Sequence, residues 1–136
     1  MADFNARVVE EFRAGGGRVG GDFAEFTLIL LHHVGARSGV ERVSPAGCSI
    51  QGDGRYAVIA ANGGAARRPG WYHNLKAHPR ITVELGTETF TVLADEVEGD
   101  AHTELWDRLV AEFPHVAAFP GKAGRPIPLF LLTRQD

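Results

Sequence analysis

The chain has 136 residues and a formal net charge of −3, so it is long enough to form one hydrophobic core without disulfide bonds. Its pI of about 6.1, and the lack of basic runs interleaved with aromatic residues, exclude nucleic acid as the main ligand. The single cysteine, Cys48, excludes an intrachain disulfide and a multi-cysteine metal site, and it predicts a cytoplasmic location.

The beginning of the chain predicts a helix rather than a targeting or membrane segment. Residues 1–22 lack the apolar core of a signal peptide, and the longest apolar run is far too short to span a bilayer. Phe4, Val8 and Phe12 recur at helical spacing after Asp3, which is placed to cap the helix, and a glycine-rich linker follows. We expect one domain over residues 1–136, with this helix docked on it; contact with a membrane surface is the alternative.

Apolar runs separated by turn residues then predict a mainly antiparallel sheet. The first part of the sheet is expected to comprise residues 26–34, 43–51 and 55–61. The strand at 26–34 has no polar face, which is typical of a strand covered on both sides. Pro45 has no N–H to donate, so it predicts an edge, an end or a bulge.

The second half of the chain continues this pattern. Alternation of polar and apolar residues predicts a hairpin, and a closing strand follows a loop that would line or cover a pocket. Two helices are expected between these strands, the first opened by Pro69 and the second capped by Asp100. The expected strands are 80–85, 89–97 and 127–133, the helices 70–77 and 100–113, and the loop 114–126.

Two glycine-rich loops carry the candidate binding residues. Residues 35–39 present Arg37 and Ser38, with Arg42 close behind, which suits a phosphate; a hairpin turn with exposed polar residues is the alternative. The turn at 62–64 leaves main-chain N–H groups open to a flat or anionic ligand. The strands before the two loops run the same way in an antiparallel meander, so both loops are expected at one end of the sheet.

The charge pattern also indicates an anionic partner near the second loop. Residues 54–83 contain no Asp or Glu, although an even spread would place about four there. A solvated loop of mixed polarity is the alternative. Trp71, at the start of a helix, is placed to stack on a planar ring or to anchor the core. The basic residues of this window are Arg55, Arg67, Arg68, Lys76 and Arg80.

No acid, base, nucleophile or metal site stands out in the sequence. His32 and His33 are adjacent on a strand and so face opposite sides, and no other pair of histidines has ligand spacing. Ser38 is not in a nucleophile elbow, and neither a Rossmann nor a P-loop motif occurs. Chemistry is therefore expected to reside in a bound cofactor that the protein positions.

The same stretches resemble the deazaflavin-dependent nitroreductase family, whose members bind the reduced deazaflavin coenzyme F-420. The resemblance spans nearly the whole chain and implies an α+β, mainly antiparallel fold, the split β-barrel of FMN-binding-like proteins with flanking helices. The matching sequence segments are Gly35-Ala-Arg-Ser-Gly39 with Arg42 and Pro45, Ala60-Ala-Asn-Gly-Gly64, Pro69-Gly-Trp-Tyr-His-Asn-Leu-Lys-Ala-His-Pro79 and Arg125-Pro-Ile-Pro128.

The resemblance also implies roles for individual residues. Arg37, Ser38 and Arg42 would hold the coenzyme's phosphate, and cations of the basic window would receive its oligoglutamate tail. No catalytic residue is assigned by the resemblance; Tyr72 and water are the candidates for the proton that follows the hydride. The full set implied to bind the cofactor is Arg37, Ser38, Gly39, Arg42, Val43, Pro45, Ala60, Ala61, Asn62, Gly63, Gly64, Arg67, Arg68, Trp71, Tyr72 and Asn74.

The positions matching the tyrosines of nitroimidazole-reducing members are Phe113, Val116 and Phe119, which carry no hydroxyl. The resemblance therefore implies an F-420-dependent oxidoreductase that transfers a hydride to a quinone-like or other conjugated small-molecule acceptor, rather than a drug-type nitroreductase. Two alternatives stay open: an FMN-binding reductase of the same fold, and a non-catalytic protein that carries a cofactor or heme. A monomer and a homodimer both fit the sequence.

Overall fold

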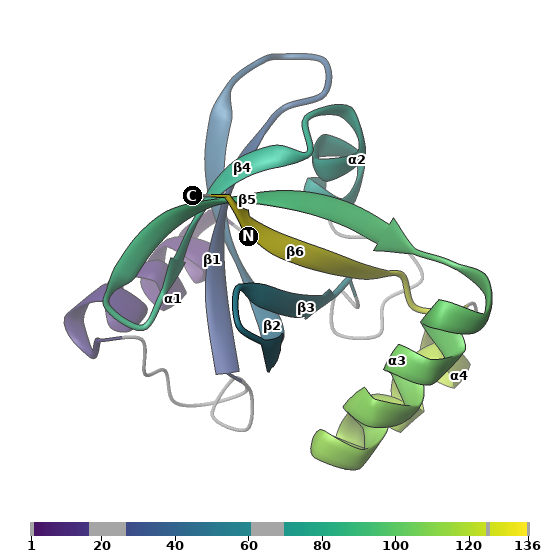
Figure 1. The fold of residues 1–136 in the computed structure, drawn as a ribbon. Coiled ribbons are helices and arrows are strands. Elements are labelled where there is room, and N and C mark those ends of the chain that lie inside the picture. The colour runs from purple at the N-terminus through teal and green to yellow at the C-terminus, as the bar shows by residue number, and fades with distance from the viewer. Residues whose placement is uncertain (1, 17–26, 61–69, 125, 136) are drawn as a thin grey trace.

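The computed structural model describes residues 2–16, 27–60, 70–124 and 126–135. Six antiparallel strands close into a barrel in the order β1-β2-β3-β6-β5-β4 (Figure 1). The predicted α+β, mainly antiparallel barrel with flanking helices is confirmed. The strands are β1 (Thr27–Val34), β2 (Glu41–Gly52), β3 (Arg55–Ile59), β4 (Arg80–Leu85), β5 (Glu88–Val97) and β6 (Leu129–Gln135), and the helices are α1 (Ala2–Ala14), α2 (Gly70–Ala77), α3 (Gly99–Glu112), the 3₁₀ helix η3 (Pro114–Ala118) and α4 (Phe119–Ala123).

The barrel interior is filled by alternate residues of the strands, because successive side chains in a strand point to opposite faces. Helix α2 adds Trp71 and Leu75 to this cluster. The strand residues of this cluster that are almost fully buried include Ile29, Leu31, Val58, Val83, Val92, Phe130 and Leu132.

Two further hydrophobic clusters lie outside the barrel wall. Helix α1 packs Val8 and Phe12 on Leu28 and Leu30 of β1. On another side, α3, η3 and α4 cover the outward side chains of β3 and β6. Figure 1 shows α3 and α4 on the opposite side of the barrel from α1. Strand β1 is therefore covered on both faces, as its continuous apolar run predicts.

The β1–β2 hairpin extends well past the end of β3. Val34 pairs with Glu41 at the tip of the hairpin, whereas Gly47 pairs with Ile59 at the end of β3. At ~3.3 Å per residue, this offset of six positions along β2 is about 20 Å. Helix α2 lies beside the projecting part and contacts β1 and β5 (Figure 1). Pro45 lies within this part of β2, outside the stretch that pairs with β3, so its predicted edge position is confirmed.

Three of the predictions about helices are wrong. Helix α1 begins at Ala2, so Asp3 lies within the helix instead of capping it. Residues 114–126, expected as a loop, contain η3 and α4, whose prolines occupy first-turn positions that need no N–H partner. Helix α3 begins at Gly99, and Glu98 at its N-cap makes no side-chain capping bond, so Asp100 lies in the first turn instead of capping the helix.

Candidate functional site

The β1–β2 loop runs from Gly35 to Val40 and is closed on itself by main-chain hydrogen bonds. Gly35 N–H donates to Val40 O at 2.9 Å, and Gly39 N–H donates to Gly35 O at 3.0 Å. Ser38 Oγ accepts from Val40 N–H at 3.2 Å and occupies the space that a Cβ on Gly35 would need. Gly39 has a φ of 69°, which favours glycine. This geometry needs both glycines, and it leaves Arg37 and Ser38 exposed.

Arg42 extends the polar surface of this loop along β2. It is exposed and lies directly across from His33 at the tip of the hairpin. Within the ranges that the structure describes, neither Arg42 nor Arg37 forms an ion pair with a carboxylate. The side chains of Val43 and Pro45 lie on the opposite face of β2 from Arg42, and Val43 packs in the α1 cluster.

Asn74 of α2 joins this helix to the β1–β2 loop. Its Oδ1 accepts from Ala36 N–H at 2.9 Å, and its Nδ2 lies 2.8 Å from His33 Nδ1. His33 Nε2 lies 2.8 Å from Ser44 Oγ. Burial, and then the charge of Arg42, lower the pKa of His33 to about 4. Nothing in the local sequence pattern of His33 or Ser44 shows what these residues contact.

The aromatic residues of α2 have two different environments. Trp71 is 6% exposed and packs inside the barrel, with its ring centroid 6.0 Å from that of Phe130. Trp71 therefore lies where a core anchor is expected, which is the alternative to stacking on the ring of a ligand. Tyr72 is half-buried, and its Oη donates to the two carboxylate oxygens of Glu96 at 3.0 and 3.1 Å.

Glu96 of β5 is a neighbour of the candidate site that no local sequence pattern predicts. Its carboxylate also accepts from Lys76 Nζ at 2.7 Å, and this hydrogen bond is the largest cause of a raised pKa at Lys76. Residues 54–83 contain no acid of their own, but the fold brings one to them from β5. Lys76 is therefore already paired in this structure.

The other predicted binding residues are not all brought together. Arg55 begins β3, at the far end of that strand from the candidate site, whereas Arg80 is exposed at the start of β4, close behind α2. Ala60 is buried at the end of β3, and its N–H donates to Pro128 O at 2.9 Å. Ala61, Asn62, Gly63, Gly64, Arg67 and Arg68 lie outside the described residues.

The three predicted substrate-pocket residues lie in the cluster under α3. Phe113 and Val116 are buried and Phe119 is partly buried, packed with the outward face of β3 at Ile59. Ile59 directly precedes Ala60, so this cluster borders the point where the chain leaves β3. The structure therefore places the three side chains with β3 and β6 and not with the β1–β2 loop.

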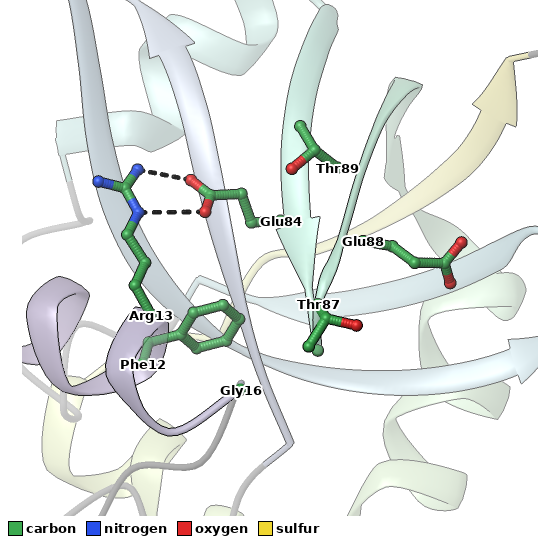
Figure 2. Close-up of a pocket in the computed structure, with 8 residues that line it drawn as sticks. Phe12, Arg13, Gly16, Glu84, Thr87, Glu88 and Thr89 are labelled. Atoms are coloured by element: carbon green, nitrogen blue, oxygen red, sulfur yellow. Dashed lines mark hydrogen bonds and ion pairs between the residues drawn. The ribbon is translucent and has the colours of Figure 1, made fainter.

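A separate hollow of about 220 Å³ lies between the end of α1 and the β4–β5 hairpin (Figure 2). Arg13 Nε and Nη2 donate to the carboxylate of Glu84 at 3.1 and 2.6 Å, and this fork is the first cause of a lowered pKa at Glu84. His32 Nε2 lies 2.7 Å from the same carboxylate. These charged groups bind one another, so the hollow offers a weaker case for a ligand than the β1–β2 loop.

Comparison with known proteins shows the family and the fold. Residues 5–134 match the family model described as F420H(2)-dependent quinone reductase. A relative from Mycobacterium tuberculosis (strain H37Rv), an F420H(2)-dependent quinone reductase, is 35% identical over 111 residues, which cover 79% of this chain and 73% of the relative.

Two solved structures share both the fold and a recognisable sequence. An F420-H2 dependent reductase is 33% identical with a TM-score of 0.68, over 77% of this chain and 92% of that one. A structure described as a domain-swapped dimer is 30% identical with a TM-score of 0.69, over 96% and 95% of the two chains. The chain thus belongs to the F420H(2)-dependent quinone reductase family.

Proposed function

We propose that this protein is an F-420-dependent oxidoreductase that passes a hydride from the reduced deazaflavin to a quinone-like small-molecule acceptor. Membership of the family supports the cofactor and the reaction class. The observation in the structure that carries the proposal is the exposed, internally braced β1–β2 loop, with Arg37, Ser38 and Arg42 at the tip of the hairpin.

The groups at this tip fit the anionic end of such a coenzyme. Two guanidinium groups and a hydroxyl are donors suited to phosphate oxygens. The nearest acid on β2, Glu41, lies on the opposite face, where its carboxylate is 3.6 Å from His32 Nδ1. Arg80 adds a further exposed cation at the start of β4.

In this proposal the chain contributes binding and orientation, and the bound deazaflavin supplies the hydride. Arg37, Ser38 and Arg42 hold the phosphate, while α2 forms the wall beside the ring. Trp71 anchors that wall in the barrel interior. The proton for the acceptor comes from water or from Tyr72, whose Oη is held by Glu96.

Fluorescence titration of purified protein with F-420 tests the binding site. Arg37→Ala removes a charge-assisted contact to phosphate, and such contacts are worth about 1.5–3 kcal/mol, so binding should weaken about tenfold or more. Arg55→Ala is the matched control, because it removes an exposed arginine at the far end of β3; its affinity should stay within about twofold of wild type. Undetectable binding to wild type, or equal losses in both variants, would contradict the proposal.

Turnover distinguishes the enzyme from a carrier. We expect steady oxidation of reduced F-420 when menadione is added as the acceptor. Binding without turnover would support a carrier, and a yellow protein with an FMN spectrum that ignores F-420 would support the FMN alternative. Light scattering on the same sample would separate a monomer from a homodimer.

A further inference from the structure

Three hydrogen bonds in series connect the exposed β1–β2 loop to the interior of the hairpin. They run from Ala36 N–H to Asn74, from Asn74 to His33, and from His33 to Ser44, with lengths of 2.9, 2.8 and 2.8 Å. Asn74 is the only residue of this series on α2, so it is the residue that connects the helix to the loop.

The direction of each bond follows from the first. A main-chain N–H only donates, so the Asn74 atom facing Ala36 is the oxygen, and the atom facing His33 is the amide nitrogen. That nitrogen also only donates, so His33 Nδ1 accepts, and the proton of a neutral imidazole lies on Nε2, from which it is donated to Ser44 Oγ. A protonated His33 would present an N–H to the Asn74 amide and break the series.

The series fits a site that binds an anion next to Arg42. His33 is 3% exposed, and its place across from Arg42 would set two positive charges side by side if it were ionised. A neutral imidazole leaves the charge of Arg42 directed to the ligand. Each polar end of the Asn74 side chain makes a hydrogen bond within the protein, which fits a part in holding the loop.

We propose that Asn74 is a positioning residue that sets the β1–β2 loop against α2, and so sets the spacing between the phosphate-binding and ring-binding parts of the coenzyme site. This inference rests on the proposed function. A ligand that reaches both parts gains from a loop held in place beforehand, because less order has to be imposed on binding. A ligand that reaches only the ring side gains little.

Two ligands separate these effects: F-420 itself, and a truncated deazaflavin that ends at the ribityl chain and lacks the phosphate and the glutamate tail. For Asn74→Ala we expect the dissociation constant of F-420 to rise about tenfold, from the loss of the hydrogen bond and of loop order. The dissociation constant of the truncated compound should change less than about twofold. Equal losses for both ligands, or no loss for F-420, would overturn the proposal.

Two further variants guard against a general loss of structure. Ser49→Ala also removes a hydrogen bond between β2 and a helix, since Ser49 Oγ donates to Glu112 of α3, together with one within β2 from Gln51; both affinities should stay near wild type. His33→Asn keeps an acceptor near the position of Nδ1 and should retain most of the F-420 affinity. If Ser49→Ala reproduced the selective loss, or His33→Asn lost as much as Asn74→Ala, Asn74 would have no positioning role.

Hydrogen exchange at the Ala36 amide, followed by NMR without ligand, tests the tie itself. We expect this amide to be protected in wild type and to exchange much faster in Asn74→Ala, while the amides of Gly35 and Gly39 keep their loop partners. Equal exchange of Ala36 in both proteins would overturn the inference even if F-420 binds. If the Ala36 amide loses its protection in Asn74→Ala as expected, but wild type does not bind F-420, the proposed function fails instead.

Discussion

Two adjacent histidines on β1 face opposite sides of the barrel wall and have different surroundings. His32 lies on the outer face, near Glu84 and Glu41. His33 lies on the other face, between Asn74 and Ser44. The alternation of side chains along a strand predicts that the two histidines face opposite sides. The partners that give each ring its role come from other strands and from a helix.

The first prediction concerns pH. The pKa of His33 is about 4 in the folded protein against an ordinary value of 6.5. Between these values the unfolded chain binds the proton and the folded protein does not, so stability should fall as the pH is lowered from about 6.5 to about 4. Urea unfolding of wild type and His33→Asn across this range measures the difference. We expect the variant to lack this part of the slope; identical slopes would contradict the assignment.

The second prediction compares the two tryptophans. Trp71 is buried in the barrel interior, so Trp71→Ala should lower the free energy of unfolding by about 3–5 kcal/mol. Trp106 is only partly buried on α3, so Trp106→Ala should be less destabilising. Because Trp71 anchors the helix that carries Asn74, F-420 binding should also weaken more in Trp71→Ala, or in the milder Trp71→Phe. The reverse order, with both proteins folded, would mean that α2 is only structural.

At the scale of elements, short helices depend on what they pack against. Helix α2 has eight residues, too few to be stable alone. It is held by its buried side chains, by Glu96 on β5 and by the bond from Asn74 to the loop. Glu96 lies on β5 and Ala36 lies in the β1–β2 loop, so α2 joins β5 to the β1–β2 hairpin. Its position, and that of any ligand wall it forms, is set by both.

The third prediction concerns what holds α1 in place. Phe12 is 1% exposed, so Phe12→Ala should lower stability by about 3–5 kcal/mol through the cavity it leaves. The Arg13 side chain is 51% exposed, and exposed ion pairs are typically worth less than about 1 kcal/mol, so Arg13→Gln should have a small effect that shrinks further with salt. Thermal unfolding at low and high salt measures both. A larger loss in Arg13→Gln would mean that the fork in Figure 2 is the main attachment.

At the scale of the whole molecule, closure of the barrel decides what is accessible. Closure gives every strand two neighbours, so no strand in the described residues is open along its whole length, although the part of β2 that extends past β3 keeps an unpaired edge. Among the described side chains of α1, Val8 and Phe12 face the barrel, which gives the predicted docking helix its buried surface. None of the helices in the described ranges has both the length and the apolar character needed to cross a membrane.

The fourth prediction uses Cys48 as a reporter of barrel opening. Its thiol is fully buried in the interior, and burial raises its pKa to about 12. Only the thiolate reacts, so a thiol reagent should label the native protein no faster than the barrel unfolds, and should label it rapidly in urea. The labelling rate should rise in Trp71→Ala, which destabilises the same interior. Rapid labelling of the native protein would show that the barrel opens locally.

Much of the fold is predictable from the sequence because its signals are local. Apolar runs, alternation and proline or glycine punctuation place most of the strands and helices, and the same signals place Arg37, Ser38 and Arg42 on an exposed hairpin tip. The stretch at 114–126 is mistaken for a loop because two short, proline-opened helices have too few residues to show a period. Asp100 is mistaken for a cap because helix boundaries are only weakly marked.

The sequence by itself determined most of the elements, the antiparallel arrangement and the composition of the proposed anion-binding tip, since each depends on neighbouring residues. Only the tertiary structure decided what supports that tip. Asn74 meets Ala36 across 38 positions and His33 across 41, and Tyr72 meets Glu96 across 24. No local pattern encodes such pairs, because they depend on the register of the closed barrel and on where α2 comes to rest against it.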